Sequence, residues 1–335
     1  MTPPLEDRFA GSLIGQALGD ALGFVVEGHP PARCRRYVDE VLKAGRAGEG
    51  GRAPFAFGQY TDDTQLAREL IESYVACKGF DPADYARRIA AIFAEGRIVG
   101  RGRTTEAAAL RLAQGVSWDQ AGTPAPAAGN GSAMRAGPVG LMSFDDPDGL
   151  IRAARDQGRI THADPRCSAG AVAIAGAVAL ALGGGSVEPA RFLGQLAGWT
   201  RAIEGSLASC LGRLVDWTRL APEDAQPLIS AAGSEPGYSD RWEGISPFVT
   251  ASVLWSLYAF LKSPGDYWQT ISTAIAVGGD VDTTAAMAGA VSGAYNGLAA
   301  VPGDLAGRLN DQGTWDYDAL VGLAREAYRV KTGEP

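Results

Sequence analysis

Histidine and cysteine are scarce in this chain of 335 residues, and their scarcity excludes several kinds of site. The sequence contains two histidines and four cysteines, and no two cysteines stand at a CxxC spacing. Zinc sites use imidazole or thiolate ligands, and a disulfide framework needs patterned cysteines. We therefore expect reduced thiols in a cytoplasmic protein. A metal site would have to use carboxylate and hydroxyl oxygens, which suit Mg²⁺ or Mn²⁺.

The chain also lacks an evident boundary and a basic surface. No Pro-, Ser- or Gly-rich linker and no charge block divides it, so we expect one domain over residues 1–335. Lys and Arg number 30 against 38 Asp and Glu, which makes the net charge −8. Nucleic acid is therefore not an expected partner, because binding it needs clustered Lys and Arg.

Targeting and membrane signals are weak. The first residues lack the basic region and apolar core of a signal peptide. Residues 167–187 and 283–303 carry no charge and are long enough to imitate membrane spans. Both consist mainly of Ala, Gly, Ser and Thr, so we expect buried, closely packed helices and no membrane partner.

Much of the sequence shows the periodicity of amphipathic helices. Apolar residues recur at four-residue spacing over residues 5–22, and glycines recur every four residues from Gly11 to Gly23. Such glycines permit helices to cross closely. Because no convincing alternating strand is present, we predict an all-α fold. Further helices are expected over residues 33–43, 62–77, 82–95, 104–113, 190–202, 206–220, 223–232, 247–261 and 264–277, with one short and one longer helix within 305–330.

Two acidic clusters stand at predicted helix starts. Thr61, Asp62 and Asp63 form one, and Asp280, Asp282 and Thr283 form the other, directly after two glycines. Adjacent carboxylates repel and raise each other's pKa, whereas a divalent cation keeps them ionised. Asp and Thr are also favoured at helix N-termini. Spacing alone therefore leaves a shared metal site and two ordinary helix caps both open.

Two glycine-containing loops are candidate anion sites. Gly100, Arg101 and Gly102 precede a predicted helix, whose start can present N–H groups to an anion. The second loop runs from Gly129 to Arg135, and its Asn-Gly and Gly-Ser steps favour positive φ and an exposed backbone. A purely structural turn would use the same residues.

Two isolated titratable residues have ordinary explanations as well as functional ones. His162 is either a structural histidine or a ring that lines a pocket. Glu27 is either an exposed loop carboxylate or part of a site.

Five motifs in order resemble the ADP-ribosylglycohydrolase family, which includes nitrogenase-reactivating hydrolases and related ADP-ribosyl-acceptor hydrolases. The match spans nearly the whole chain. The motifs are Gly15 to Gly23 with Glu27, Thr61 to Thr64, Gly129 to Arg135, Thr161 with His162, and Gly279 to Thr283.

The resemblance implies an orthogonal bundle of α-helices around a cleft that holds two divalent cations, Mg²⁺ or Mn²⁺. It assigns the metal ligands to Thr61, Asp62, Asp63, Asp280, Asp282 and Thr283. It places substrate against Asn130, Gly131, Ser132, Ala133, Met134 and His162, with Gly100, Arg101 and Gly102 as a second loop. Glu27 would assist the acid or base step, and Asp62 and Asp282 would be essential to catalysis.

The implied reaction is hydrolysis of the glycosidic bond between ADP-ribose and an acceptor, either a protein side chain or a small molecule, with ADP-ribose as product. A catalytically inactive binding or structural member, or a hydrolase of another N- or O-ribosyl compound, is the alternative. The complete set of expected ligands favours an enzyme. No carboxylate stands between Glu95 and Glu106, so a strict preference for ADP-ribosyl-arginine is not expected. A monomer is expected.

Overall fold

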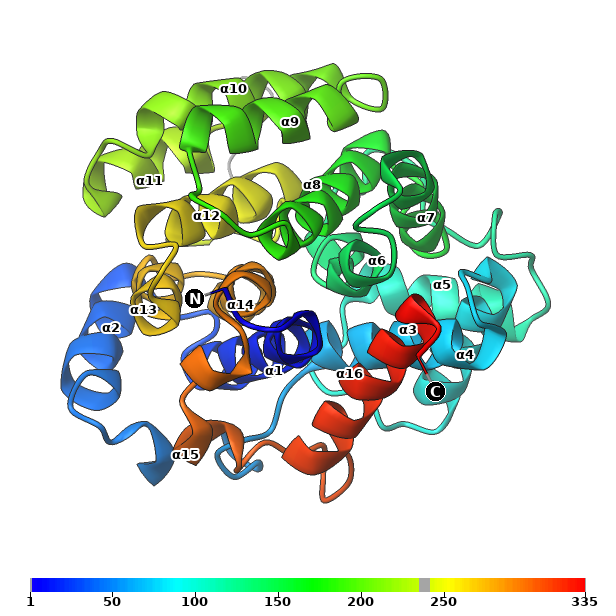
Figure 1. Cartoon of the computed structure of the whole chain (residues 1–335), viewed down its shortest axis with the longest axis horizontal. Coiled ribbons are helices and arrows are strands. Elements are labelled where there is room, and N and C mark those ends of the chain that lie inside the picture. The colour runs from blue at the N-terminus through cyan, green and yellow to red at the C-terminus, as the bar shows by residue number, and fades with distance from the viewer. Residues whose placement is uncertain (1, 235–241, 335) are drawn as a thin grey trace.

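The computed structural model describes residues 2–234 and 242–334, and in these ranges the fold is built from helices alone (Figure 1). Five isolated bridges are present and no strand is formed in the described ranges. The prediction of an all-α fold is confirmed. The helices are α1 Leu5–Phe24, α2 Pro31–Tyr37, α3 Asp62–Cys77, α4 Pro82–Ala94, α5 Arg103–Ala113, α6 Gly137–Met142, α7 Pro147–Arg159, α8 Pro165–Leu182, α9 Pro189–Thr200, α10 Gly205–Trp217, α11 Pro222–Ser230, α12 Val249–Lys262, α13 Tyr267–Ala276, α14 Val281–Asn296, α15 Gly303–Ala306 and α16 Tyr317–Thr332.

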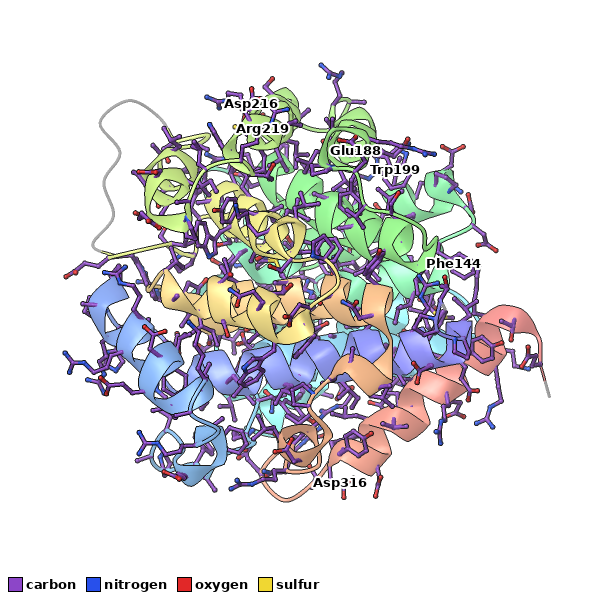
Figure 2. The ribbon with its side chains drawn as sticks, turned by 60° about the vertical axis from the view of Figure 1, so that its left-hand side comes forward. Phe144, Glu188, Trp199, Asp216, Arg219 and Asp316 are labelled. Atoms are coloured by element: carbon purple, nitrogen blue, oxygen red, sulfur yellow. The ribbon has the colours of Figure 1, made fainter. Side chains whose placement is uncertain are left out.

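The centre of the fold is the pair of helices α1 and α14, which lie side by side in Figures 1 and 2. Glycines let the two backbones touch. A Cβ atom on Gly15 would lie 2.5 Å from the carbonyl oxygen of Gly289, and one on Gly19 would lie 2.3 Å from that of Ala285. Both helices are buried on nearly all sides. Because of this close contact, the end of α1 lies beside the start of α14.

Further layers cover this pair. α8 and α12 pack against α14, and α9 and α10 form an outer layer over them (Figure 1). Figure 2 shows Glu188, Asp216 and Arg219 on the outer surface of that layer. Within the described ranges α8 is long and apolar enough to cross a membrane, but 83% of it is buried inside the fold. A core helix passes the same test.

Several helix boundaries differ from the sequence prediction for local reasons. The helix expected over 264–277 begins at Tyr267, because Asp266 caps it by accepting a hydrogen bond from the Gln269 N–H at 2.9 Å. The helix expected over 33–43 begins at Pro31, where a proline costs no hydrogen bond. Its second half, Val38–Leu42, is a π-helical turn.

We expect Gly15→Ala to destabilise the protein by about 2 kcal/mol, because its methyl group would collide with the α14 backbone. Gly194→Ala in α9 is the matched control. No atom of the described residues lies within 4 Å of a Cβ at this exposed position, so alanine should be neutral or stabilising by about 0.5 kcal/mol. Urea unfolding measures both. Equal stability of the two variants would contradict close packing of α1 on α14.

Candidate active site

A buried carboxylate on α1 organises the start of α3. Asp20 is fully buried and accepts hydrogen bonds from the backbone N–H groups of Thr61 at 3.0 Å and Thr64 at 3.1 Å. It also accepts from the hydroxyls of Thr61 at 2.9 Å and Thr64 at 2.6 Å. These contacts satisfy N–H groups that a helix start leaves without partners. Asp62 and Asp63, the first two residues of α3, are thereby oriented beside α1.

The start of α14 is shaped by two glycines. Gly278 and Gly279 have φ of 77° and 89°, which residues with a Cβ rarely adopt. The turn exchanges hydrogen bonds with two other segments. The Gly28 N–H donates to the Gly279 carbonyl at 2.8 Å, and the Asp280 N–H donates to the Ile245 carbonyl at 2.8 Å. This bonding holds the loop that carries Glu27 against the start of α14.

The two acidic clusters converge on one site. The Thr283 hydroxyl lies 3.4 Å from Asp63 Oδ2 and 3.4 Å from Asp280 Oδ1, although Asp63 and Thr283 are 220 positions apart. One oxygen from each of Glu27, Asp280 and Asp282 lies within 4.8 Å of the others, a spacing that can hold a metal ion. The structure thus brings together all six residues expected as metal ligands, with Glu27 beside them.

The electrostatics of this group favour a bound cation. Burial, followed by repulsion from neighbouring carboxylates, raises the pKa of Asp62, Asp63 and Asp282 well above its usual range. Burial is also the main reason that the pKa of Asp20 and that of Asp280 rise to about 7. Asp63 Oδ1 and Asp282 Oδ1 are buried, and no hydrogen-bond donor among the described residues reaches them. Such oxygens are costly unless a positive charge compensates them, so the residues fit divalent cations.

Glu27 differs from the other carboxylates because it is partly exposed and already paired. Its Oε2 accepts a hydrogen bond from Arg52 Nη1 at 2.5 Å. The same nitrogen donates to the Phe24 carbonyl at 3.1 Å, and the guanidinium stacks 4.8 Å from the Phe24 ring centre. Arg52 therefore ties Glu27 to the end of α1, while one Glu27 oxygen lies within 4.8 Å of oxygens of Asp280 and Asp282.

The loop over residues 100–102 lies against the start of α3. The Gly102 N–H donates to Asp62 Oδ2 at 3.4 Å, and a Cβ on Gly100 would lie 3.2 Å from Asp62 Oδ1. Gly100 has φ of 75°. The Arg101 side chain points outward and pairs with Glu106 at 3.1 Å. The loop thus contributes backbone to the site, while its arginine lies on the surface.

The second loop departs from the sequence prediction. Asn130–Ser132 form a 3-10 turn that is buried, and neither Gly129 nor Gly131 has positive φ, so the expected exposed, left-handed backbone is wrong. The physical reason is that Asn130 ties the turn inward. Its side-chain amide donates to Asp280 Oδ2 at 2.5 Å and to Ser252 Oγ at 3.0 Å.

The remaining residues of this loop are largely committed to the protein interior. Ser132 donates its hydroxyl to the Cys167 carbonyl at 2.9 Å. The N–H groups of Ala133 and Met134 bond to the Asn130 carbonyl, and both side chains are buried. The Gly131 N–H makes no hydrogen bond to described residues outside its turn. The polar groups of this loop are therefore bonded mainly within the protein.

His162 lies beside the same turn. A Cβ on Gly131 would be 3.2 Å from His162 Nε2, and one on Gly129 would be 3.5 Å from it. The ring is 2% exposed. Burial and the nearby Arg135 guanidinium lower the pKa of His162 to about 3, so the ring is neutral at ordinary pH.

Sequence reasoning missed two residues of the site, Asp20 and Arg52. Asp20 carried a detectable signal, because it is the only charged residue between Arg8 and Glu27 in a stretch of small and apolar residues. A lone charge inside such a helix is expected to be buried and paired. Arg52 carried none, since it stands in a glycine-rich loop whose path depends on tertiary contacts.

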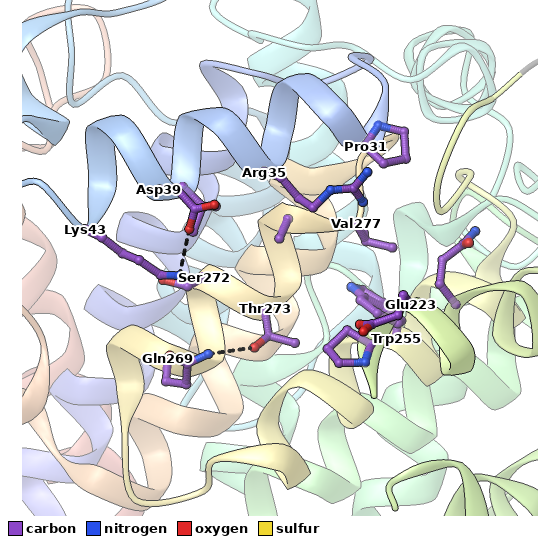
Figure 3. Close-up of a pocket in the computed structure, with 14 residues that line it drawn as sticks. Pro31, Arg35, Asp39, Lys43, Glu223, Trp255, Gln269, Ser272, Thr273 and Val277 are labelled. Carbon is purple, nitrogen blue, oxygen red and sulfur yellow. Dashed lines mark hydrogen bonds and ion pairs between the residues drawn. The ribbon is translucent and has the colours of Figure 1, made fainter. Parts of the chain in front are cut away.

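A separate groove of about 770 Å³ lies between α2, α11, α12 and α13 (Figure 3). Lys43 in its wall is paired with Asp39 at 2.8 Å, and Gln269 donates to Thr273. None of the acidic-site residues lines it. Its lining includes Arg35, Lys43, Glu223, Trp255, Gln269 and Thr273.

Comparison with known proteins gives consistent matches. The family model described as ADP-ribosylglycohydrolase matches residues 1–334. ADP-ribosylhydrolase ARH3 of Homo sapiens is 32% identical over 304 residues, which cover 83% of this chain and 82% of that protein. The ADP-ribosyl-[dinitrogen reductase] glycohydrolase of Rhodospirillum rubrum is 31% identical over 194 residues, covering 56% of this chain and 63% of that protein. A solved structure described as an ADP-ribosylglycohydrolase-related protein complex matches with a TM-score of 0.71 and 28% identity, covering 97% of this chain and 98% of that chain.

The raised carboxyl pKa values predict an unusual pH dependence of the free energy of unfolding when EDTA keeps the protein free of metal ions. Because the folded-state pKa of Asp20 and Asp280 is about 7, the folded state binds more protons than the unfolded state between about pH 4 and pH 7. The contribution of these groups to the free energy of unfolding therefore falls as pH rises through this window. We expect a lower Tm in EDTA at pH 8 than at pH 5.5.

Asp280→Asn tests whether Asp20 and Asp280 cause this pH dependence. It removes one of the two carboxyl groups and should therefore reduce the change in Tm with pH. Asp304→Asn, at an exposed position of α15, should leave it unchanged. Calorimetric scans across pH provide the measurement. If the Tm of the wild-type protein in EDTA rose from pH 5.5 to pH 8, this explanation of the pH dependence would be contradicted.

Proposed function

Because this chain belongs to the ADP-ribosylglycohydrolase family of glycosidic-bond hydrolases, we propose that it removes ADP-ribose from a protein side chain with the help of two divalent cations, Mg²⁺ or Mn²⁺. The observation that carries the metal part is the meeting of two acidic helix starts around Asp63 Oδ1 and Asp282 Oδ1. Both oxygens are buried and have no donor in the part of the chain that the structure describes. The family supplies the reaction class.

The metal ligands in this proposal are the two acidic clusters. Asp280 and Asp282 form one group of oxygen ligands, and Glu27 lies beside them. Asp62 and Asp63 form the adjoining group. Thr61 and Thr283 add hydroxyl oxygens. Bound cations would supply Lewis acidity toward the ribose oxygens and would lower the pKa of an attacking water.

The chain's own groups would act on the substrate in three ways. The buried carboxylates would stabilise the positive charge that develops at the anomeric carbon in an oxocarbenium-like transition state. Asn130, already bonded to Asp280, would position the substrate next to the acidic group. Burial of the cluster restricts bulk water around the reacting bond.

Glu27 is the group we assign to proton transfer. It is less buried than the aspartates, with 25% of its side chain exposed, so a proton taken up there can exchange with solvent. Arg52 donates a hydrogen bond to one of its oxygens and so restrains the carboxylate. Such positioned general acid or base catalysis contributes about 10²- to 10⁴-fold in rate.

We expect Glu27→Gln to lower kcat by about 10²-fold or more while Mg²⁺ binding measured by calorimetry persists, because the proton-transfer group is lost. Asp282→Ala should abolish both turnover and Mg²⁺ binding. Asp216→Asn, at a 78% exposed position of α10, is the control and should match the wild type. Hydrolysis of an ADP-ribosylated peptide that continues unchanged in EDTA would contradict the metal mechanism.

The charge around the loop over residues 100–102 suggests a neutral acceptor. Because Arg101 pairs with Glu106, this loop presents no unpaired carboxylate to a positively charged acceptor. We expect ADP-ribosyl-serine peptides to be cleaved faster than ADP-ribosyl-arginine peptides. Arg101→Ala should release Glu106 and narrow the ratio of the two kcat/KM values by about threefold to tenfold. An unchanged ratio would remove this loop from acceptor selection.

A further inference from the structure

Arg135, Thr161 and His162 form a buried chain of polar groups that the metal chemistry does not use. Arg135 is fully buried, and its Nη2 donates to the Thr161 hydroxyl oxygen at 2.8 Å. The same hydroxyl lies 2.8 Å from His162 Nδ1. The guanidinium is itself held by Gln157, through bonds of 2.9 Å to its side chain and to its carbonyl.

The direction of these bonds determines where the histidine proton sits. A guanidinium only donates, so the Thr161 oxygen is an acceptor toward Arg135. Thr161 is 0% exposed, and within the described ranges its hydroxyl has no acceptor other than His162 Nδ1. If Nδ1 carried a proton, the hydroxyl hydrogen would be buried without a partner, which is energetically unfavourable. Thr161 therefore donates to Nδ1, and the neutral ring carries its proton on Nε2.

The Nε2–H group faces the turn that adjoins the acidic site. Within the described ranges it has no hydrogen-bond partner, and the histidine as a whole is 2% exposed. The nearest turn positions are Gly129 and Gly131, where any Cβ would crowd the ring, at 2.7 Å from Cε1 in the case of Gly131. Between these glycines stands Asn130, whose amide touches Asp280. A ligand oxygen in front of Nε2 would thus lie beside the candidate metal ligands.

We propose that Thr161 and Arg135 are positioning residues that hold His162 as the Nε2–H tautomer, so that the ring donates a hydrogen bond to an acceptor oxygen of ADP-ribose. This inference rests on the proposed function for the identity of the ligand. The tautomer itself follows from the buried hydrogen-bond chain alone. The lowered pKa of His162 agrees with a ring that stays neutral.

The scarcity of histidine makes the tautomer directly measurable. With only His29 and His162 in the chain, ¹⁵N-histidine labelling yields two imidazoles in an NMR spectrum, and His29→Gln assigns them. In the free wild-type protein we expect His162 to show an unprotonated Nδ1 and a protonated Nε2. A protonated Nδ1 would overturn the proposal, whether or not the protein hydrolyses ADP-ribosyl bonds.

Thr161 variants test the positioning role. Thr161→Val removes the donor to Nδ1, so the tautomers should mix and ADP-ribose affinity by calorimetry should fall about threefold to tenfold. Thr161→Ser keeps the hydroxyl and should retain both wild-type properties. Thr200→Val, which deletes another fully buried hydroxyl, in α9, is the matched control and should change neither.

The outcomes separate this inference from the proposed function. A wild-type Nε2–H tautomer that Thr161→Val leaves unaltered would overturn the positioning role. Mixed tautomers with undiminished ADP-ribose affinity would overturn the contact with ligand. Absence of hydrolysis together with the expected tautomer and affinity changes would reject the catalytic proposal alone and support this one.

Discussion

Repulsion among buried carboxylates is the constraint on which the structure around the site depends. Asp20, Asp62, Asp63, Asp280 and Asp282 are all at most 5% exposed and lie in one region. Charges held so close together in a low-dielectric environment strongly disfavour the ionised state. The fold counters this repulsion with donors from α3, the Asn130 amide and the Thr283 hydroxyl. Two oxygens still have no donor within residues 2–234 and 242–334. The resulting affinity for positive charge is the property that a cation-assisted hydrolase can use.

The rest of the architecture keeps this unfavourable arrangement in place. Backbone contact between α1 and α14 fixes Asp20 relative to the start of α14. At the other side, α3 is anchored by buried Arg68, which bonds to Glu69 and to Asp311 at 2.8 Å each. If these acidic side chains stood on mobile segments, their mutual repulsion would drive them apart. Here the carboxylates are held close together by contacts that lie outside the acidic group itself.

The site also divides its tasks by burial. The aspartates lie deep, where their electrostatic effect is strongest, while Glu27 sits at the edge and is held by Arg52. Arg135, Thr161 and His162 form a buried hydrogen-bonded chain beside the turn that contains Asn130. A negatively charged region and a neutral hydrogen-bonding region thus stand next to each other. This pairing suits a substrate that carries both a ribose at the reacting bond and phosphates farther away.

The sequence alone determined the class of fold and the chemistry available to the site. Helical periodicity without alternation predicted an all-α fold, and the shortage of His and Cys restricted any metal site to oxygen ligands. Motif order indicated the family. The fold class and the family are confirmed, because both depend on local pattern and residue type.

Only the tertiary structure decided which residues meet. The contact of Thr283 with Asp63, the burial of Asp20 and the pairing of Arg52 with Glu27 join segments that no short-range pattern connects. The turn at Asn130–Ser132 is the instructive failure, because its sequence favours a left-handed backbone and a bond to Asp280 draws it into a buried 3-10 turn instead. Local propensities are worth about 1 kcal/mol, and a buried charged hydrogen bond outweighs them.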